Sequence, residues 1–150
     1  MGGISTFLWF DDQAVAAARH YLSIFPNSRL HGEPADDAMT VAFELDGRPF
    51  TALNGGPLFA FTPAISFVVS CADQSEVDFY AERLSEGGSE GQCGWVTDKF
   101  GLSWQVVPSV LGELMGDPDP VKAGRVTTAM LAMHRLDIQT LMLAHSGGSG

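Results

Sequence analysis

Apolar residues along the chain follow two spacings, one typical of strands and the other typical of helices. Residues 4–10 are rich in aromatic and branched side chains and predict a strand. The next apolar residues recur at helical spacing over 14–25, after Asp11 and Asp12, which are suited to cap a helix. Three more strands are predicted at 29–32, 39–45 and 49–54. The order β-α-β-β-β defines a first module, with an Asp-Gly turn between its last two strands.

A similar order of elements returns in the second half of the chain. Ile4-Ser5 recurs as Ile65-Ser66, and Asp12-Gln13 recurs as Asp73-Gln74, at a single offset. This second module has a predicted strand at 64–71, a helix at 75–87, a strand region at 90–96 and a last strand at 102–107. A duplicated unit tends to bury its apolar face against its copy, and the cleft between the copies is a natural place for a small ligand.

Beyond Pro108 the repeat is over and the apolar spacing becomes helical. A short helix containing Leu111 is followed by a helix from about Asp117 to Met133, and by a last helix around Leu141. Methionine adapts to irregular contacts, so this Met-rich tail could pack on the sheet or on a second subunit, and we favour the second subunit.

The predicted fold class is α+β, with two paired modules of mixed strands and one helix each, plus C-terminal helices. We expect one domain over residues 1–145 and a flexible tail at 146–150. Within the domain, module one spans about 4–57, module two about 64–108, and the helical tail 109–145.

Composition narrows the classes of function. The 150 residues are 45% hydrophobic, which supports a real core. The formal net charge is −10, from 18 acidic and 8 basic residues, and it disfavours nucleic acid and anionic membranes, since both bind clustered Lys and Arg. The two cysteines form no Cys-x-x-Cys pair, and no apolar run approaches the ~18 residues of a membrane span. We expect a soluble cytoplasmic protein.

Six motifs resemble a known family: FLWFD (7–11), FELDG (43–47), FTALNGGP (50–57), EGQCGW (90–95), DKFG (98–101) and SWQVVP (103–108). They are similar to the PhnB-like branch of the vicinal-oxygen-chelate superfamily, which contains glyoxalase I, extradiol dioxygenases and antibiotic-resistance proteins. The resemblance covers residues 4 to about 141. It implies paired βαβββ modules, each curling its sheet into half of a barrel-like cleft, and a homodimer.

Members of this branch are often labelled 3-demethylubiquinone-9 3-methyltransferase, but the residues do not predict methyl transfer. A Rossmann methyltransferase places a Gly-rich turn between a strand and a helix. The corresponding turns here hold Asp11-Asp12 and Ala72-Asp73.

Metal-dependent members of the superfamily place His or Glu near the starts of strands one and five and on the closing strands. The resemblance maps those positions to about Ser5, Asn54, Ser66 (or Ala64) and Gln105. Hydroxyls and amides bind divalent cations poorly compared with imidazole and carboxylate, so we expect no cofactor and do not favour a metal. The serines either bind a ligand or only satisfy strand ends, whereas we favour a pocket role for Asn54 and Gln105.

The segment Gln92-Cys93-Gly94-Trp95 offers further candidates. Cys93 would be a nucleophile if a base lowered its pKa, but no His is near it in sequence, and a small buried thiol is the simpler interpretation. Trp95 and Trp104 either wall a ligand or pack in the core. The catalytic residues are unknown, and the candidate ligand-binding residues are Ser5, Asn54, Ser66, Gln92, Cys93, Trp95, Trp104 and Gln105.

These patterns favour a metal-free, homodimeric protein that binds a small organic molecule in a cleft of neutral polar and aromatic residues. Two alternatives stay open. One is an enzyme of the same superfamily, of isomerase, lyase or dioxygenase type, with or without a metal. The other is a protein-interaction module that uses the C-terminal helices.

Overall fold

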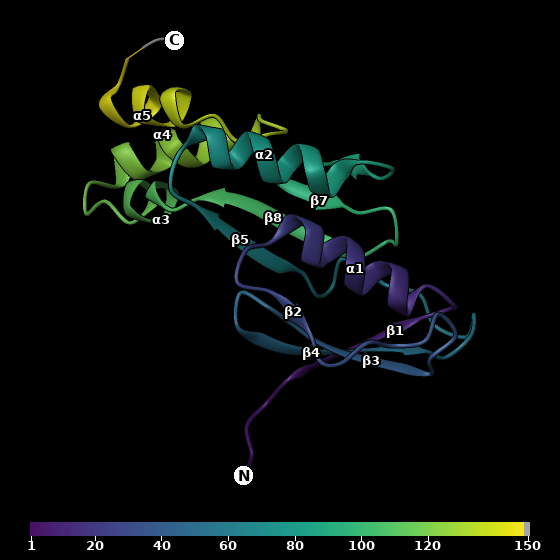
Figure 1. Cartoon of the computed structure of the whole chain (residues 1–150). Coiled ribbons are helices and arrows are strands. Elements are labelled where there is room, and N and C mark those ends of the chain that lie inside the picture. Colours follow the sequence, from purple (N-terminus) through teal and green to yellow (C-terminus); the bar gives the residue numbers. More distant parts are fainter. Residues whose placement is uncertain (149–150) are drawn as a thin grey trace. The chain divides into compact units, whose positions relative to one another are not determined.

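A computed structural model describes residues 1–148 and divides the chain into two units, one ending at Phe61 and the other beginning at Thr62 (Figure 1). Each unit begins with a βαβββ module, and the second unit continues into three more helices. The predicted α+β class, with paired modules and C-terminal helices, is confirmed. No helix in the described part of the chain is long and apolar enough to cross a membrane.

The first module is a four-stranded sheet with one helix on it. Its elements are β1 (Thr6–Phe10), α1 (Ala14–Ile24), β2 (Arg29–Leu30), β3 (Thr40–Leu45) and β4 (Arg48–Asn54). The strands lie in the order β1-β4-β3-β2, with β1 parallel to β4 and the other pairs antiparallel. Alternate residues such as Leu8, Phe10 and Phe43 are buried on the face that α1 covers, as is Tyr21 of the helix. We call the face of a sheet that is turned away from its own helix the far face.

The start of α1 differs from the prediction. The N-cap residue is Gln13 rather than Asp11 or Asp12, and its side chain makes no capping bond. Instead, the side-chain oxygen of Asn54, at the end of β4, accepts a hydrogen bond from the Ala14 backbone N–H at 2.8 Å. An N–H group at the start of a helix needs such a partner, and here a neighbouring strand supplies it, so the local sequence does not reveal it.

The second module repeats this arrangement. Its elements are β5 (Phe67–Cys71), α2 (Gln74–Ser85), β6 (Ser89–Glu90), β7 (Trp95–Thr97) and β8 (Ser103–Pro108), in the sheet order β5-β8-β7-β6. Strand β5 is parallel to β8, as β1 is to β4. In contrast to α1, α2 is capped locally, because the Asp73 carboxylate accepts a hydrogen bond from the Glu76 N–H at 2.9 Å.

Helices α3 (Val110–Met115), α4 (Pro120–Leu131) and α5 (Ile138–Ser146) pack on one another within the second unit. Their shared core consists of Leu111, Leu114, Val126, Leu136 and Leu141. Met130 and Met133 pack against this core, so the chain itself covers part of the Met-rich surface for which the sequence favours a second subunit. Of the predicted flexible tail, Ser146 belongs to α5, and Ser149 and Gly150 lie outside the described residues.

Candidate ligand-binding site

The far face of the second sheet gathers three of the predicted ligand-binding residues. Gln105 of β8 lies opposite Val68 of β5 and opposite Trp95 of β7 in the strand register. Ser66 precedes Val68 by two residues and therefore lies on the same face. Val68 is 61% exposed, whereas Ser66, Trp95 and Gln105 are half-buried. A hydroxyl, a carboxamide and an indole thus share one accessible surface, which we call the far-face site.

Ser66 and Gln105 form a neutral hydrogen-bonded pair. The side-chain N–H of Gln105 donates to the Ser66 hydroxyl oxygen at 2.9 Å. Among residues 1–148, the bond leaves the carboxamide oxygen of Gln105 and the hydroxyl hydrogen of Ser66 without a partner. One group accepts and the other donates, so the pair suits a ligand with hydroxyl, amide or carbonyl groups.

Trp95 follows a tight turn that holds two other predicted residues. The Trp95 N–H donates to the carbonyl oxygen of Gln92 at 3.0 Å. Between them, Cys93 (φ 57°) and Gly94 (φ 85°) both have positive φ, as in a type I′ hairpin turn. The turn splits the predicted strand region at 90–96 into two short strands. It also leaves Gln92 exposed and Cys93 half-buried at the end of the sheet beside Trp95.

The side chain of Trp104 lies on the opposite face of the sheet from Gln105. Consecutive residues of a strand point to opposite faces, so these two neighbours cannot both line the far face. Trp104 is 3% exposed, and its indole N–H donates to the Asp98 carboxylate at 2.9 Å. Its role in this structure is packing, and we leave it out of the far-face site.

The two remaining predicted residues belong to the first unit. Ser5 is exposed and lies just before β1. Asn54 lies opposite Phe10 on the face that α1 covers, and both ends of its carboxamide are in use. The oxygen accepts from Ala14, and the N–H donates to the Ala38 carbonyl oxygen at 2.9 Å. Asn54 therefore has a structural role, and we leave it out of the far-face site as well.

The strand register explains why the repeat misplaced Asn54. Thr51 lies opposite Phe7 in the first sheet, as Gln105 lies opposite Val68 in the second, and Phe7 and Val68 differ by the offset of the repeat. The residue equivalent to Gln105 is therefore Thr51. The sequence mapping was out of step by three residues, which is enough to move a side chain to the other face.

The donors of the far-face site do not fit a divalent metal. Ser66 and Gln105 are neutral and already hydrogen-bonded to each other, whereas such metals prefer imidazole, thiolate and carboxylate ligands. Within residues 1–148, no three His, Cys, Asp or Glu side chains form a group that could hold a metal ion.

The two cysteines are free thiols in different surroundings. Cys71 is fully buried in β5, and burial raises its pKa to about 11, with a further contribution from the nearby carboxylates of Glu76 and Asp73. Its thiolate is therefore disfavoured at neutral pH. Cys93 is half-buried in the turn beside Trp95, so it is the thiol that a small molecule can reach.

His134 is a neighbour of this turn that the sequence did not reveal. Its ring Nδ1 lies 3.0 Å from the Gly91 carbonyl oxygen, and its Nε2 lies 3.5 Å from the side-chain nitrogen of Gln92. The sequence predicts a helix to about Met133, whereas α4 ends at Leu131 and His134 lies in the non-helical segment that follows. His134 and Gln92 are 42 residues apart, so neither helical nor strand spacing could connect them.

A separate groove of about 600 Å³ lies between α4 and α5 and contains none of the predicted site residues. Its one charged lining residue, Arg125, donates to the carbonyl oxygens of Ala144 and His145 at 2.8 and 2.9 Å. The guanidinium therefore satisfies the last carbonyls of α5 rather than facing a ligand. We place the candidate site on the far face, because accessible polar groups and an aromatic ring converge there.

Comparison with known proteins assigns most of the chain to a family. The family model described as 3-demethylubiquinone-9 3-methyltransferase matches residues 2–107. The match ends before α3, whereas the sequence resemblance was expected to reach about residue 141. No curated protein matches the chain.

Solved structures share the fold. A PhnB protein from Bacillus cereus that carries the same methyltransferase description is 28% identical, with a TM-score of 0.62 over 70% of this chain and 98% of that chain. PA1353 from Pseudomonas aeruginosa is 20% identical, with a TM-score of 0.60 over 72% and 98% of the two chains. The fosfomycin resistance protein FosX from Listeria monocytogenes, in a complex with Mn(II) and sulfate, is 18% identical, with a TM-score of 0.50 over 75% and 94%.

Proposed function

This chain belongs to the family described as 3-demethylubiquinone-9 3-methyltransferase, in the glyoxalase-like superfamily, and we propose that it binds a small organic molecule at the far-face site. The observation that supports this most is the neutral Ser66–Gln105 pair beside Trp95. A hydroxyl or carbonyl group of the ligand would bond to the pair, and an apolar part would pack on the indole. Gln92 and Cys93 would border the ligand at the end of the sheet.

Methyl transfer is not part of this proposal, although the family's description names it. The turns that follow β1 and β5 hold acidic residues, Asp11-Asp12 and Asp73, in place of the Gly-rich turn with which a Rossmann methyltransferase binds its cofactor.

We propose that binding needs no metal, because the donors of the site are neutral. Elemental mass spectrometry of untagged, freshly purified protein tests this. We expect fewer than ~0.1 equivalents of transition metal per chain, whereas a specific metal site would hold nearly one equivalent. Near one equivalent per chain would contradict the proposal. It would favour the alternative of a metal-assisted isomerase, lyase or dioxygenase.

We also propose that the protein is a cytoplasmic homodimer. Its net charge of −10 supports a small-molecule partner over nucleic acid or an anionic membrane. The family resemblance implies the dimer, and the exposed apolar side chains of Ile4 and Phe7 support it.

Binding can be detected by ¹⁹F NMR after incorporation of 5-fluorotryptophan, which labels Trp9, Trp95 and Trp104. In a screen of small neutral compounds with hydroxyl or carbonyl groups, hits are expected to shift the Trp95 signal. They should leave the Trp104 signal in place, because Trp104 is 3% exposed.

The variant Gln105→Ala is expected to raise the dissociation constant of the best-binding compound about tenfold, equivalent to about 1.4 kcal/mol, because one hydrogen bond is lost. Gln139→Ala is the matched control, because Gln139 is exposed on α5. If no compound shifts Trp95, or if the two variants bind equally well, the proposed function is wrong.

A further inference from the structure

Residues 133–136 link α4 to α5 and run across the second unit as a non-helical segment, which we call the strap. The strap lies outside the part of the chain that the family model matches, which ends at residue 107. One of its ends contacts the turn at residues 92–95, and its other end contacts the exposed side of α2. It therefore connects the helix to the turn that precedes Trp95.

The turn is bound to the strap through its own backbone. The N–H groups of Cys93 and Gly94 donate to the carbonyl oxygens of Met133 and His134 at 2.8 and 2.7 Å. These are the two residues of the turn with positive φ, and the left-handed conformation is unfavourable for Cys93 because it has a Cβ. The strap contacts thus hold a backbone conformation that the sequence of the turn alone does not favour.

Gly94 also shows how closely the strap approaches. A Cβ atom at this position would lie 3.1 Å from Leu136 Cδ1 and 2.7 Å from the Val106 carbonyl oxygen. Leu136 itself is 1% exposed and belongs to the core of the C-terminal helices. The turn is therefore packed directly against the strap and β8, and a larger residue at position 94 would not fit.

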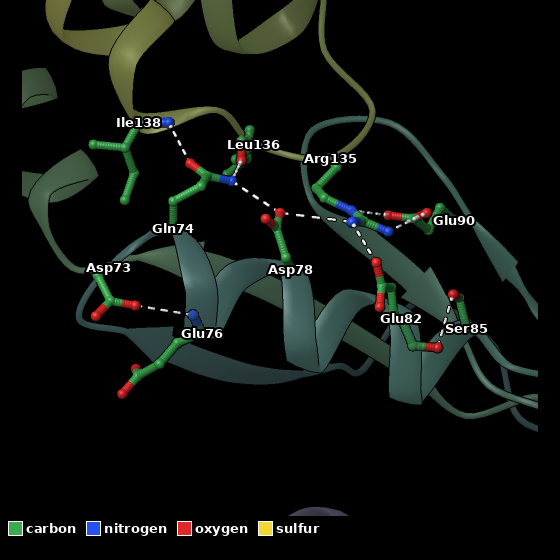
Figure 2. Close-up of polar contacts among 10 residues, drawn as sticks. All are labelled: Asp73, Gln74, Glu76, Asp78, Glu82, Ser85, Glu90, Arg135, Leu136 and Ile138. Carbon is green, nitrogen blue, oxygen red and sulfur yellow. Dashed lines mark hydrogen bonds and ion pairs between the residues drawn. The ribbon is translucent and has the colours of Figure 1, made fainter.

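Arg135 fastens the strap to α2 and β6, as Figure 2 shows. Its Nε and Nη2 donate to the two oxygens of the Glu90 carboxylate, each at 3.0 Å. Its Nη1 lies 3.4 Å from Glu82 and 3.5 Å from Asp78. The hydrogen bonds with Glu90 hold the pKa of Arg135 well above its ordinary value, so the guanidinium stays charged. Without the guanidinium, the carboxylates of Asp78, Glu82 and Glu90 would repel one another.

Gln74 makes a second, neutral attachment at the start of α2 (Figure 2). Its side-chain N–H donates to the Leu136 carbonyl oxygen at 3.0 Å, and its oxygen accepts from the Ile138 N–H at 2.8 Å. Gln74, Asp78 and Glu82 are spaced four residues apart, so they form one stripe along α2. This stripe and Glu90 hold the strap along its length.

We propose that Arg135 and Gln74 are positioning residues: through the strap they fix the turn at residues 92–95 and thereby the orientation of Trp95 in the far-face site. The effect on a ligand rests on the proposed function, whereas the effect on Trp95 does not. The C-terminal helices thus shape the site without contributing a side chain that contacts the ligand.

The test uses the ligand-free, full-length chain labelled with 5-fluorotryptophan. In Arg135→Gln, we expect the Trp95 signal to shift and broaden, while the signal of the buried Trp104 stays unchanged. Hydrogen exchange at the Cys93 and Gly94 amides should accelerate on the order of tenfold or more, because their acceptors are no longer held. Arg83→Gln is the matched control, since Arg83 lies on α2 and pairs with Glu86 at 4.0 Å.

Two further variants separate positioning from a general loss of structure. Arg135→Lys keeps the charge and should restore part of the Trp95 signal and of the amide protection. Gln74→Ala leaves every charge in place and removes the bonds of Gln74 to Leu136, Ile138 and Asp78, so it should produce a smaller change in the same direction, and it tests the inference if Arg135→Gln fails to fold. Unchanged Trp95 signals and amide exchange in both Arg135→Gln and Gln74→Ala would overturn the inference.

The same variants distinguish the two proposals. If the Trp95 signal moves in Arg135→Gln but no neutral compound shifts it in the natural chain, the strap positions Trp95 and the proposed function fails. If the best neutral compound binds the natural chain and Arg135→Gln equally well, with Trp95 unchanged, the strap inference fails and the proposed function stands.

Discussion

Asp98 is a buried carboxylate at the turn before β8, and three hydrogen bonds converge on it. One oxygen accepts from the N–H groups of Phe100 and Leu102 at 2.9 and 3.0 Å, and the other accepts from the Trp104 indole at 2.9 Å. Asp98→Asn would turn an N–H toward the indole N–H, so we expect a loss of about 2 kcal/mol in the free energy of unfolding, measured with urea. Asp46→Asn, at the exposed turn of the first module, should change it by less than about 0.5 kcal/mol. Equal losses of unfolding free energy in the two variants would contradict the structural role of Asp98.

The two thiols should differ in reactivity. Cys71 is fully buried and its pKa is raised to about 11, whereas Cys93 is half-buried in the turn beside Trp95. We expect iodoacetamide at pH 8 to modify Cys93 and to leave Cys71 unmodified until the chain unfolds, as peptide mass spectrometry would show. Modification of Cys71 in the native protein at a similar rate would contradict the packing of β5. Cys93→Ser should abolish the native reaction.

Single residues also show what the sequence could and could not predict about the site. The register places Ser66, Trp95 and Gln105 on one face of the second sheet, as strand parity predicts, and their role in binding stays a prediction. Asn54 was misplaced because the mapping was out of step by three residues, which reverses the face, whereas the packing of Trp104 is one of the two roles that the sequence left open. His134 was missed since its contact with Gln92 depends on where the strap meets the turn at residues 92–95, and no periodic pattern encodes that.

At the scale of elements, the two module helices begin in different ways: the N-cap residue of α1 is Gln13, whereas that of α2 is Asp73. The Asp73 carboxylate accepts from the Glu76 N–H and from the Ser75 hydroxyl, and these bonds lower the pKa of Asp73. A lowered pKa means that the cap stabilises the fold above the unfolded-state pKa of about 3.9 and loses this effect as the pH falls through the folded-state pKa.

The cap therefore predicts a pH dependence. The difference in urea midpoint between the natural chain and Asp73→Ala should be largest near neutral pH and should narrow below a pH of about 4. Asp73→Asn keeps an uncharged capping oxygen, so its difference from Asp73→Ala should not change over the same range. A natural chain that behaves like Asp73→Asn at every pH would show that the charge is irrelevant.

The order of elements was predictable where each element depends on its own sequence. Strand and helical spacing predicted the βαβββ order of the first module and the three C-terminal helices, but it predicted β6 and β7 as one strand region at 90–96. The cap of α1 by Asn54 and the attachment of the strap by Arg135 join elements far apart in the sequence, and their partners are ordinary polar residues with no local signature. Long-range polar contacts were therefore the part of the fold that required a structure.

At the scale of the whole molecule, exposed apolar side chains recur at equivalent positions of the two modules. Ile4 and Ile65 are 89% and 71% exposed, and Phe7 and Val68 are 60% and 61% exposed. Each pair is separated by the offset of the repeat. An accessible apolar surface gains about 25 cal/mol per Å² when it is covered, and in the proposed homodimer a second copy would cover Ile4 and Phe7 of the first module, which leaves the far-face site of the second sheet open to a ligand.

Sedimentation velocity should therefore give the mass of two chains rather than one. Phe7→Ser is expected to raise the dimer dissociation constant about tenfold, equivalent to about 1.4 kcal/mol, because it removes an aromatic side chain from the interface. Leu131→Ser is the matched control, since Leu131 is also 60% exposed but lies at the end of α4. A chain that sediments as a single copy at submillimolar concentration would rule out the dimer. Equal weakening by both substitutions would place the interface on the C-terminal helices as well as on the first sheet.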